Sequence, residues 1–202
     1  MNRFFCFFLS CLLVFACFQT ISTVKITINS VESQYFISTV QFLQGCVMSD
    51  DAYAELVKEV HKNANALETA EEREKYLANN AGATVVYEIK TMYSHDEDLS
   101  RKLLFLFVSL ILMMFLTLNI VIFSIVAMFQ VRFAKVNILM SALTLIGGII
   151  TSIASVSWSV TKPGYATSLA LGIGNSTIYF VLYPLLMLVM YAIISKKEFG
   201  KK

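Results

Sequence analysis

Four long apolar stretches constrain this chain more than any other feature of its sequence. They lie within residues 1–24, 103–130, 136–160 and 177–195. A helix needs about 20 apolar residues to cross the ~30 Å hydrocarbon core of a bilayer, and backbone polar groups in lipid must bond within their own segment. The charged fraction is only 15%, against about 25% in soluble domains. The sequence therefore predicts a membrane-embedded, all-α four-helix bundle.

The lysines and arginines are distributed unevenly around these stretches. Residues 25–100 carry thirteen acidic and six basic residues. The basic residues outside that segment mostly flank the opposite ends of the apolar stretches: Arg3, Arg132, Lys135, Lys196, Lys197, Lys201 and Lys202. Because cytoplasmic loops are enriched in Lys and Arg, we expect both termini, the turn 131–135 and the basic tail 196–202 to be cytoplasmic. Segments 25–102 and 161–176 then face outward, extracellular or lumenal, with the plasma membrane as the expected location.

The first apolar stretch also matches a second interpretation. Residues 1–22 have the basic start, apolar core and polar end of a signal peptide. We favour retention as a span or signal anchor, because Phe18 and Gln19 are not the small residues of a cleavage site. The expected orientation of the later segments is the same under both interpretations.

The large outward segment, 25–102, has the pattern of a small α+β module. Alternating β-branched residues predict strands over 24–28 and 36–42, and 84–93 is a third candidate. Ser49 is a predicted helix N-cap, and the apolar residues after it recur at helical spacing until 79–82. We therefore expect an antiparallel sheet with one helix packed on it.

The sequence offers no recognisable catalytic or metal site. It contains no nucleophile-elbow, zinc-protease, Walker or dinucleotide motif, and the cysteines lack metal-ligand spacing. Only Cys46 lies in the large outward segment, so no disulfide can form within it; pairing between two chains remains an open alternative. We expect no enzymatic activity, no cofactor and no nucleic-acid partner.

Within the spans, a few polar and small residues are notable. A stripe of small residues follows one face of the third span: Gly147, Gly148, Thr151, Ser152, Ser155 and Ser159. Such stripes allow close helix approach in lipid, either within the chain's own bundle, which we favour, or between copies. Asn119 is an intramembrane amide whose partner we expect on a neighbouring span. Trp158 is expected as an anchor at the membrane interface.

The order of these parts resembles the claudin arrangement, with a large outer loop between the first two spans, a tight inner turn and a short second outer loop. Segment 42–47 resembles the end of a claudin loop strand, and 147–158 resembles a small-residue third span ending in Ser-Trp. The resemblance is to a divergent claudin-like group that includes peripheral myelin protein relatives and fungal PalI-type proteins. It implies an outer β-sheet continuous with the helical bundle.

These observations predict a non-enzymatic protein that organises membrane domains or cell contacts. Its partners would be the lipid bilayer and other membrane proteins, including copies of itself. An accessory subunit of a channel or transporter complex is the alternative, and a self-assembled cation-selective pore is a weaker one. Five residues are candidate contacts of the outer module: Tyr35, Phe36, Cys46, Tyr87 and Tyr93. The alternative, which we favour slightly for each aromatic residue taken singly, is that it forms part of the core of the module.

Overall fold

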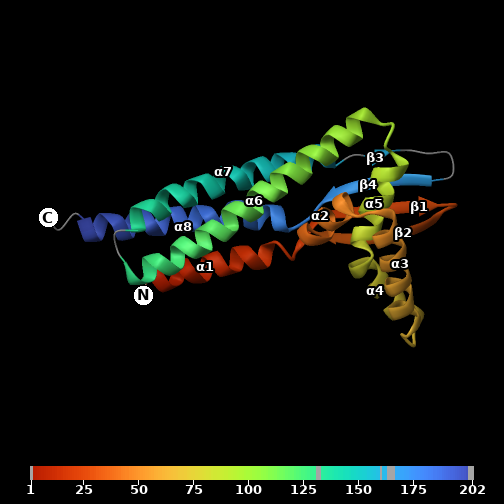
Figure 1. The fold of residues 1–202 in the computed structure, drawn as a ribbon, viewed down its shortest axis with the longest axis horizontal. Coiled ribbons are helices and arrows are strands. Elements are labelled where there is room, and N and C mark those ends of the chain that lie inside the picture. Colours follow the sequence, from red (N-terminus) through yellow and green to blue (C-terminus); the bar gives the residue numbers. More distant parts are fainter. Residues whose placement is uncertain (1, 131–132, 160, 163–166, 200–202) are drawn as a thin grey trace. The chain divides into compact units, whose positions relative to one another are not determined.

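The computed structural model describes residues 2–130, 133–159, 161–162 and 167–199. The fold is mostly helical with one antiparallel sheet, and it divides into two compact units (Figure 1). The first unit contains residues 1–18, 108–153 and 176–202, and the second contains 19–107 and 154–175. Arg132, Lys201 and Lys202, which helped to predict orientation, lie outside the described residues.

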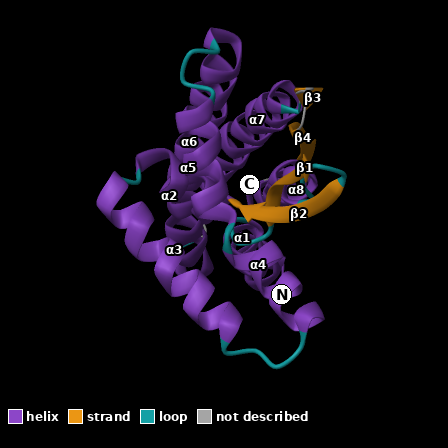
Figure 2. Cartoon of the chain, turned by 90° about the vertical axis from the view of Figure 1, so that its right-hand side faces the viewer, coloured by secondary structure: helices purple, strands orange, loops and turns teal. Residues whose placement is uncertain are grey.

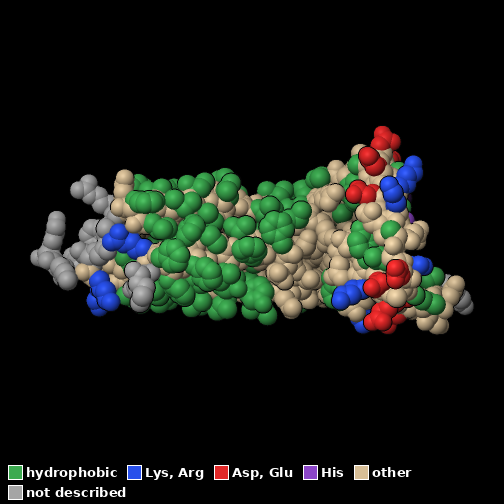
Figure 3. Space-filling model, turned by 90° about the horizontal axis from the view of Figure 1, so that it is seen from below, with side chains coloured by type: hydrophobic (Ala, Val, Ile, Leu, Met, Phe, Trp, Pro, Cys, Tyr) green, Lys and Arg blue, Asp and Glu red, His purple; other side chains and the backbone are tan. Residues whose placement is uncertain are grey.

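The first unit is built from helices α1 (Asn2–Ala16), α6 (Glu97–Phe129, from Val108 onward), α7 (Ala134–Trp158, up to Ile153) and α8 (Ser176–Phe199). Three of them, α6, α7 and α8, are long and apolar enough to cross a membrane. The helices of this unit expose many Leu, Ile, Val and Phe side chains, and hydrophobic side chains make up most of the surface of the long helical part in Figure 3. An apolar exterior of this kind fits a lipid solvent.

The buried positions of the long helices follow a heptad pattern. On α6 they recur at alternating spacings of three and four residues: Leu110, Met113, Thr117, Ile120, Ser124 and Ala127. On α7 the same spacing selects Ala134, Asn137, Ser141, Thr144, Gly148 and Thr151. This is the geometry of helices packed at small crossing angles. These buried positions of α7 are polar or small throughout, whereas its exposed side is apolar. This distribution is the reverse of the one found in a helix of a soluble protein.

The predicted span within residues 1–24 is wrong at its C-terminal end. Helix α1 has 15 residues, about 22 Å at 1.5 Å per residue, which is shorter than the ~30 Å core. Strand β1 (Thr20–Ile28) takes over the rest. Its β-branched residues fit an extended strand, and pairing on both sides satisfies its backbone. The structure thus shows three long apolar helices and one shorter apolar helix rather than four full-length spans.

The second unit contains a four-stranded antiparallel sheet in the order β2-β1-β4-β3. Strands β1 and β2 (Val31–Ser38) form a hairpin whose two-residue turn, Asn29-Ser30, has positive φ at both positions. That is the type I′ turn, whose twist matches the strands it joins. Strands β3 (Thr161–Lys162) and β4 (Thr167–Ile173) come from the segment predicted to be a plain outer loop. The sheet therefore combines strands from both outward segments.

Two predicted strands of the module are wrong. The predicted strand 36–42 ends at Ser38, where a capping box with Gln41 starts helix α2 (Thr39–Val47). The predicted strand 84–93 is helix α5 (Gly82–Met92), whose Val85, Val86 and Ile89 are buried. A short apolar run fits either state by periodicity alone, and here packing against α2 selects the helix.

The helix predicted to start at Ser49 is confirmed at that cap but is two helices. Helix α3 (Asp50–Asn65) begins with the Ser49 side chain accepting from the backbone of Ala52. It ends before a second capping box, Thr69 with Glu72, which starts α4 (Ala70–Asn80). Four helices rather than one thus accompany the sheet (Figure 2).

One face of the sheet is covered and the other is open. Val24, Ile37, Leu169 and Leu171 are buried on the covered face. Strand β2 contacts α2, α4 and α5. The open face carries Thr23, Lys25 and Thr27 from β1, beside Glu32, Gln34 and Phe36 from β2. Strand β2 forms one edge of the sheet and contacts helix α4.

Candidate interaction surface

Strand β2 is an edge strand with half of its backbone groups directed away from the sheet. Its one strand neighbour among the described residues is β1. Ile28 and Val31 close the two-residue hairpin, so they form a hydrogen-bonded pair, and such pairs alternate along an antiparallel ladder. The N–H and C=O groups of Glu32, Gln34 and Phe36 consequently point outward. An unpaired row of this kind is a template for another strand.

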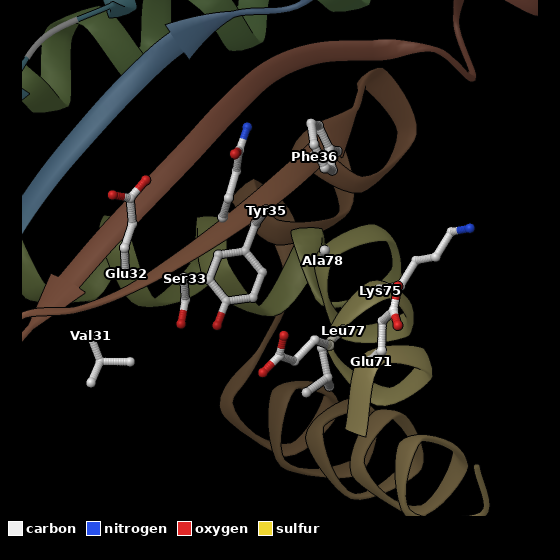
Figure 4. A pocket seen from close by; sticks show the side chains of 11 residues that line it. Val31, Glu32, Ser33, Tyr35, Phe36, Glu71, Lys75, Leu77 and Ala78 are labelled. Carbon is white, nitrogen blue, oxygen red and sulfur yellow. The ribbon is translucent and has the colours of Figure 1, made fainter. Parts of the chain in front are cut away.

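A cavity lies between this edge and helix α4. Its volume is about 410 Å³, within the ~300–1,000 Å³ of typical ligand pockets. The side chains of Ser33 and Tyr35 lie on the face of β2 toward α4, whereas Glu32 and Phe36 lie on the other face (Figure 4). The residues that line it are Val31, Glu32, Ser33, Gln34, Tyr35, Phe36, Glu71, Glu74, Lys75, Leu77 and Ala78.

Most of the charged side chains that line the cavity are carboxylates. Glu71 and Glu74 lie one helical turn apart on α4 and are solvent-exposed. Glu32 adds a third carboxylate and forms an exposed ion pair with Lys25 of β1 at 2.8 Å. Lys75 is the cationic side chain of the lining. Because Lys25 neutralises Glu32, the excess negative charge of the lining comes from Glu71 and Glu74 against Lys75, and it attracts cationic groups.

The structure separates the five predicted contact residues. Tyr35 and Phe36 line the cavity, and Phe36 is 37% exposed. Tyr87 belongs to a brace between α3 and α5, where its ring stacks on Tyr53 at 4.5 Å between centroids and its hydroxyl donates to Asp50. Tyr93 lies at the end of α5, where it is half-buried. The cavity therefore retains two of the five candidates.

The tyrosines of the α3–α5 brace are held in their neutral form. The hydroxyl of Tyr53 donates to Glu88 at 2.7 Å, and this bond, with burial as a smaller cause, raises the Tyr53 pKa to about 12. The bond to Asp50 likewise raises the pKa of Tyr87. Donation to a carboxylate requires the phenolic proton, so the acidic side chains favour the protonated state.

Cys46 is a half-buried free thiol on α2. Burial raises its pKa to about 12, and the nearby Lys90 ammonium lowers it by a smaller amount. The ammonium donates to the Cys46 carbonyl at 2.9 Å. A thiol held this strongly in the neutral form is a poor nucleophile at neutral pH, which favours a packing role over a reactive one.

Four residues of the small-residue stripe pack within the first unit. A Cβ on Gly148 would lie 2.0 Å from the Phe180 carbonyl oxygen of α8, and one on Gly147 would lie 2.7 Å from Leu116 Cδ1 of α6. Thr151 donates to the Ser109 carbonyl of α6 at 3.2 Å. Ser152 is within 3.3 Å of the Thr177 carbonyl of α8. The stripe in this unit is occupied by contacts within the chain.

The last two residues of the stripe lie in the second unit, with Trp158. Ser155 donates to the Ile21 carbonyl and Ser159 to the Leu171 carbonyl, both carbonyls of the sheet. Trp158 is completely buried, and its indole N–H donates to Ser22 at 3.2 Å. The expectation of a lipid-facing interfacial indole is wrong: the ring packs edge-on against Phe42, 5.7 Å between centroids, in the protein core.

Asn119 does not bond to a neighbouring helix through its amide nitrogen. Its Nδ2 donates to the Phe115 carbonyl, one turn earlier on α6, at 2.8 Å. The expectation of a partner on another span is therefore wrong. The buried amide that links two helices is Asn137, whose Nδ2 donates from α7 to the Phe123 carbonyl of α6 at 3.0 Å. Sequence reasoning missed it, although Asn137 occupies a heptad position with Ser141 and Thr144.

Sequence reasoning also missed the carboxylates of α4. Glu71 and Glu74 were part of the charged face of one long predicted helix. The signal that separates α4 from α3 is present at Thr69-Ala70-Glu71-Glu72, a Ser/Thr-x-x-Glu capping pattern. In the part of the chain that the structure describes, no group of three metal-binding side chains comes together.

Comparisons with protein-family models, with curated proteins and with solved structures each find no match to this chain.

Proposed function

We propose that this chain is a non-enzymatic, four-span membrane protein of the plasma membrane whose outer module organises contacts with other proteins through the β2 edge. The observation that carries the proposal is the unpaired β2 edge beside the acidic cavity of about 410 Å³. Native sheets usually cover, shorten or twist away such an edge. Here residues 31–34 and Phe36 of the eight-residue edge strand are exposed.

The charge distribution supports an outward orientation for the module. Lys135 lies in the first turn of α7, and Lys196 and Lys197 occupy the last turn of α8. The second unit holds the acid-rich segment. Under the positive-inside rule, both termini are cytoplasmic and the module is extracytoplasmic, with the shorter helix α1 as the first span. A short apolar helix crosses a bilayer by local thinning or by packing against a longer neighbour, and α1 packs against α8.

Site-specific photo-crosslinking in native membranes tests the proposal. A photoreactive benzoylphenylalanine in place of Gln34 sits on the outward-directed row of β2, and one in place of Glu59 on the exposed side of α3 is the matched control. We expect covalent products with another protein from position 34 and not from position 59. Products formed equally at both positions contradict the proposal. So does the absence of products from position 34. Products from position 34 with one larger protein at fixed stoichiometry favour an accessory-subunit role over an organising one.

A further inference from the structure

The backbone geometry, charges and aromatic side chains at the β2 edge determine which kind of peptide segment can bind there. We propose that the cavity between β2 and α4 binds an extended basic segment of a partner protein, which adds to the sheet as a fifth strand and directs alternate Lys or Arg side chains at Glu71 and Glu74. This inference rests on the contact role proposed for the β2 edge and names its occupant.

The backbone geometry of β2 favours an extended occupant. The outward N–H and C=O groups belong to three residues spaced by two, Glu32, Gln34 and Phe36, and this is the repeat of a strand. A peptide that pairs with them gains main-chain hydrogen bonds irrespective of its sequence. A folded helix or a small cation cannot satisfy this row, so an extended segment is the occupant that fits.

The carboxylates of α4 favour a basic occupant. The cavity side of an added strand faces α4, where Glu71 and Glu74 are exposed and one turn apart. Alternate side chains of a strand lie on one face, so basic residues at alternate positions of the added strand all face α4, where these two carboxylates attract them. Lys75 follows Glu74 directly on α4 and is the cationic side chain of the lining.

The aromatic residues of the cavity favour one orientation of the added strand. Tyr35 is half-buried on the α4 side of the cavity and offers its ring to the aliphatic stem of a lysine or to a guanidinium. Phe36 is exposed on the opposite face of β2 and offers an apolar surface to the intervening residues. The two faces thus differ, and that difference fixes which face of the added strand carries the charges.

A peptide-binding experiment on the full chain in phosphatidylcholine nanodiscs tests the inference. The probe is a fluorescent nonapeptide of alternating Lys and Thr with blocked ends, and binding is measured by fluorescence anisotropy at about 0.1 M salt, where exposed charges separated by more than ~10 Å are screened. We expect saturable binding of this peptide and none of its Glu-Thr counterpart. Saturable binding of both overturns the inference.

Backbone methylation separates strand addition from charge attraction. Two further peptides carry N-methyl groups on either all Thr or all Lys nitrogens and keep the same charge. In an added strand only one of these two sets donates to β2; antiparallel pairing with Lys facing α4 makes it the Thr set. We expect one methylated peptide to lose binding at least tenfold and the other to keep it. Equal binding by both overturns the inference.

Matched variants locate the site. Glu71→Gln with Glu74→Gln should weaken binding about tenfold, as expected for two exposed charge pairs. Glu55→Gln with Glu59→Gln removes the same charge from α3 and should leave binding unchanged; equal losses overturn the inference. If position 34 forms cross-links to a protein but the basic peptide does not bind, the contact role stands and the basic occupant is wrong. Failure of both experiments removes both proposals.

Discussion

Gly148 offers a stringent test of the helix packing, because the change is one methyl group. Its ideal Cβ would lie 2.0 Å from the Phe180 carbonyl oxygen and 2.7 Å from the carbonyl carbon. Both atoms belong to the backbone of α8, so no rotamer change relieves the overlap. Gly147→Ala is the control, since its Cβ meets the end of the flexible Leu116 side chain at 2.7 Å.

The expected magnitude follows from the overlap. An ordinary contact at 3.4 Å requires α7 and α8 to separate by about 1.4 Å near Gly148, and overpacking of this kind costs about 1–3 kcal/mol or more. The separation also stretches the 3.3 Å bond from Ser152 to Thr177, worth about 0.5–1.5 kcal/mol. Alanine recovers about 1 kcal/mol of helix propensity at either position. Gly148→Ala should therefore lower stability by about 2 kcal/mol relative to Gly147→Ala.

The assay is reversible unfolding in mixed micelles with increasing SDS, followed by circular dichroism. We expect Gly147→Ala to unfold close to the native chain and Gly148→Ala at a clearly lower SDS fraction. Equal midpoints for the two variants would refute the close approach of α7 to α8 and the packing role assigned to the stripe.

Three further predictions follow from the structure. Trp158, the single tryptophan, should show blue-shifted emission and little acrylamide quenching in the native chain; strong quenching would contradict its burial against Phe42. Burial raises the pKa of the Cys46 thiol in the folded chain to about 12, so the neutral thiol should stabilise the fold fully below about pH 9, and this stabilisation should decline as the pH rises toward 12. Alkylation of Cys46, measured by peptide mass spectrometry, should accordingly be slow at pH 8 unless the chain is unfolded; rapid native-state alkylation would contradict this. Ser141 has a buried hydroxyl without a partner in the part of the chain that the structure describes, so Ser141→Ala should raise stability by about 1 kcal/mol, and a clear loss in the same SDS titration would show that the hydroxyl is satisfied.

Hydropathy was sufficient to predict the three long helices. Helices α6, α7 and α8 coincide with predicted spans to within a few residues, because apolar length is a local property of the sequence. The Ser49 cap was also local and was predicted correctly. The hairpin turn at Asn29-Ser30 carried no Gly to announce it, so the start of β2 was missed.

Elements that depend on distant partners could not be predicted. The predicted strand 24–28 is confirmed within β1, but residues 20–23 belong to an apolar stretch that continues as helix by composition, and their strand state depends on β2 and β4. Residues 84–93 have strand-like composition, yet the burial of Val85, Val86 and Ile89 stabilises a helix. Trp158 looked interfacial because it ends an apolar span, but its indole lies against residues more than 100 positions away in the chain. Such tertiary choices override local propensity.

The residues of the candidate surface also divide into those that could be predicted from the sequence and those that could be placed only from the fold. Tyr35 and Phe36 were among the five contact candidates identified from the sequence. Glu71 and Glu74 could be placed beside them only once α4 was separated from α3 and seen to contact β2. The aromatic half of the cavity was thus predictable from composition, and the acidic half required the fold.

Labelling of single introduced cysteines in intact cells tests the central claim that the acidic module lies outside a membrane-spanning bundle. Glu72→Cys is exposed on α4, and Lys197→Cys lies in the last turn of α8. A membrane-impermeant maleimide should label position 72 in intact cells and position 197 only after permeabilisation. Labelling of position 197 but not position 72 in intact cells would contradict the orientation and, with it, the account of the β2 edge as an external contact surface.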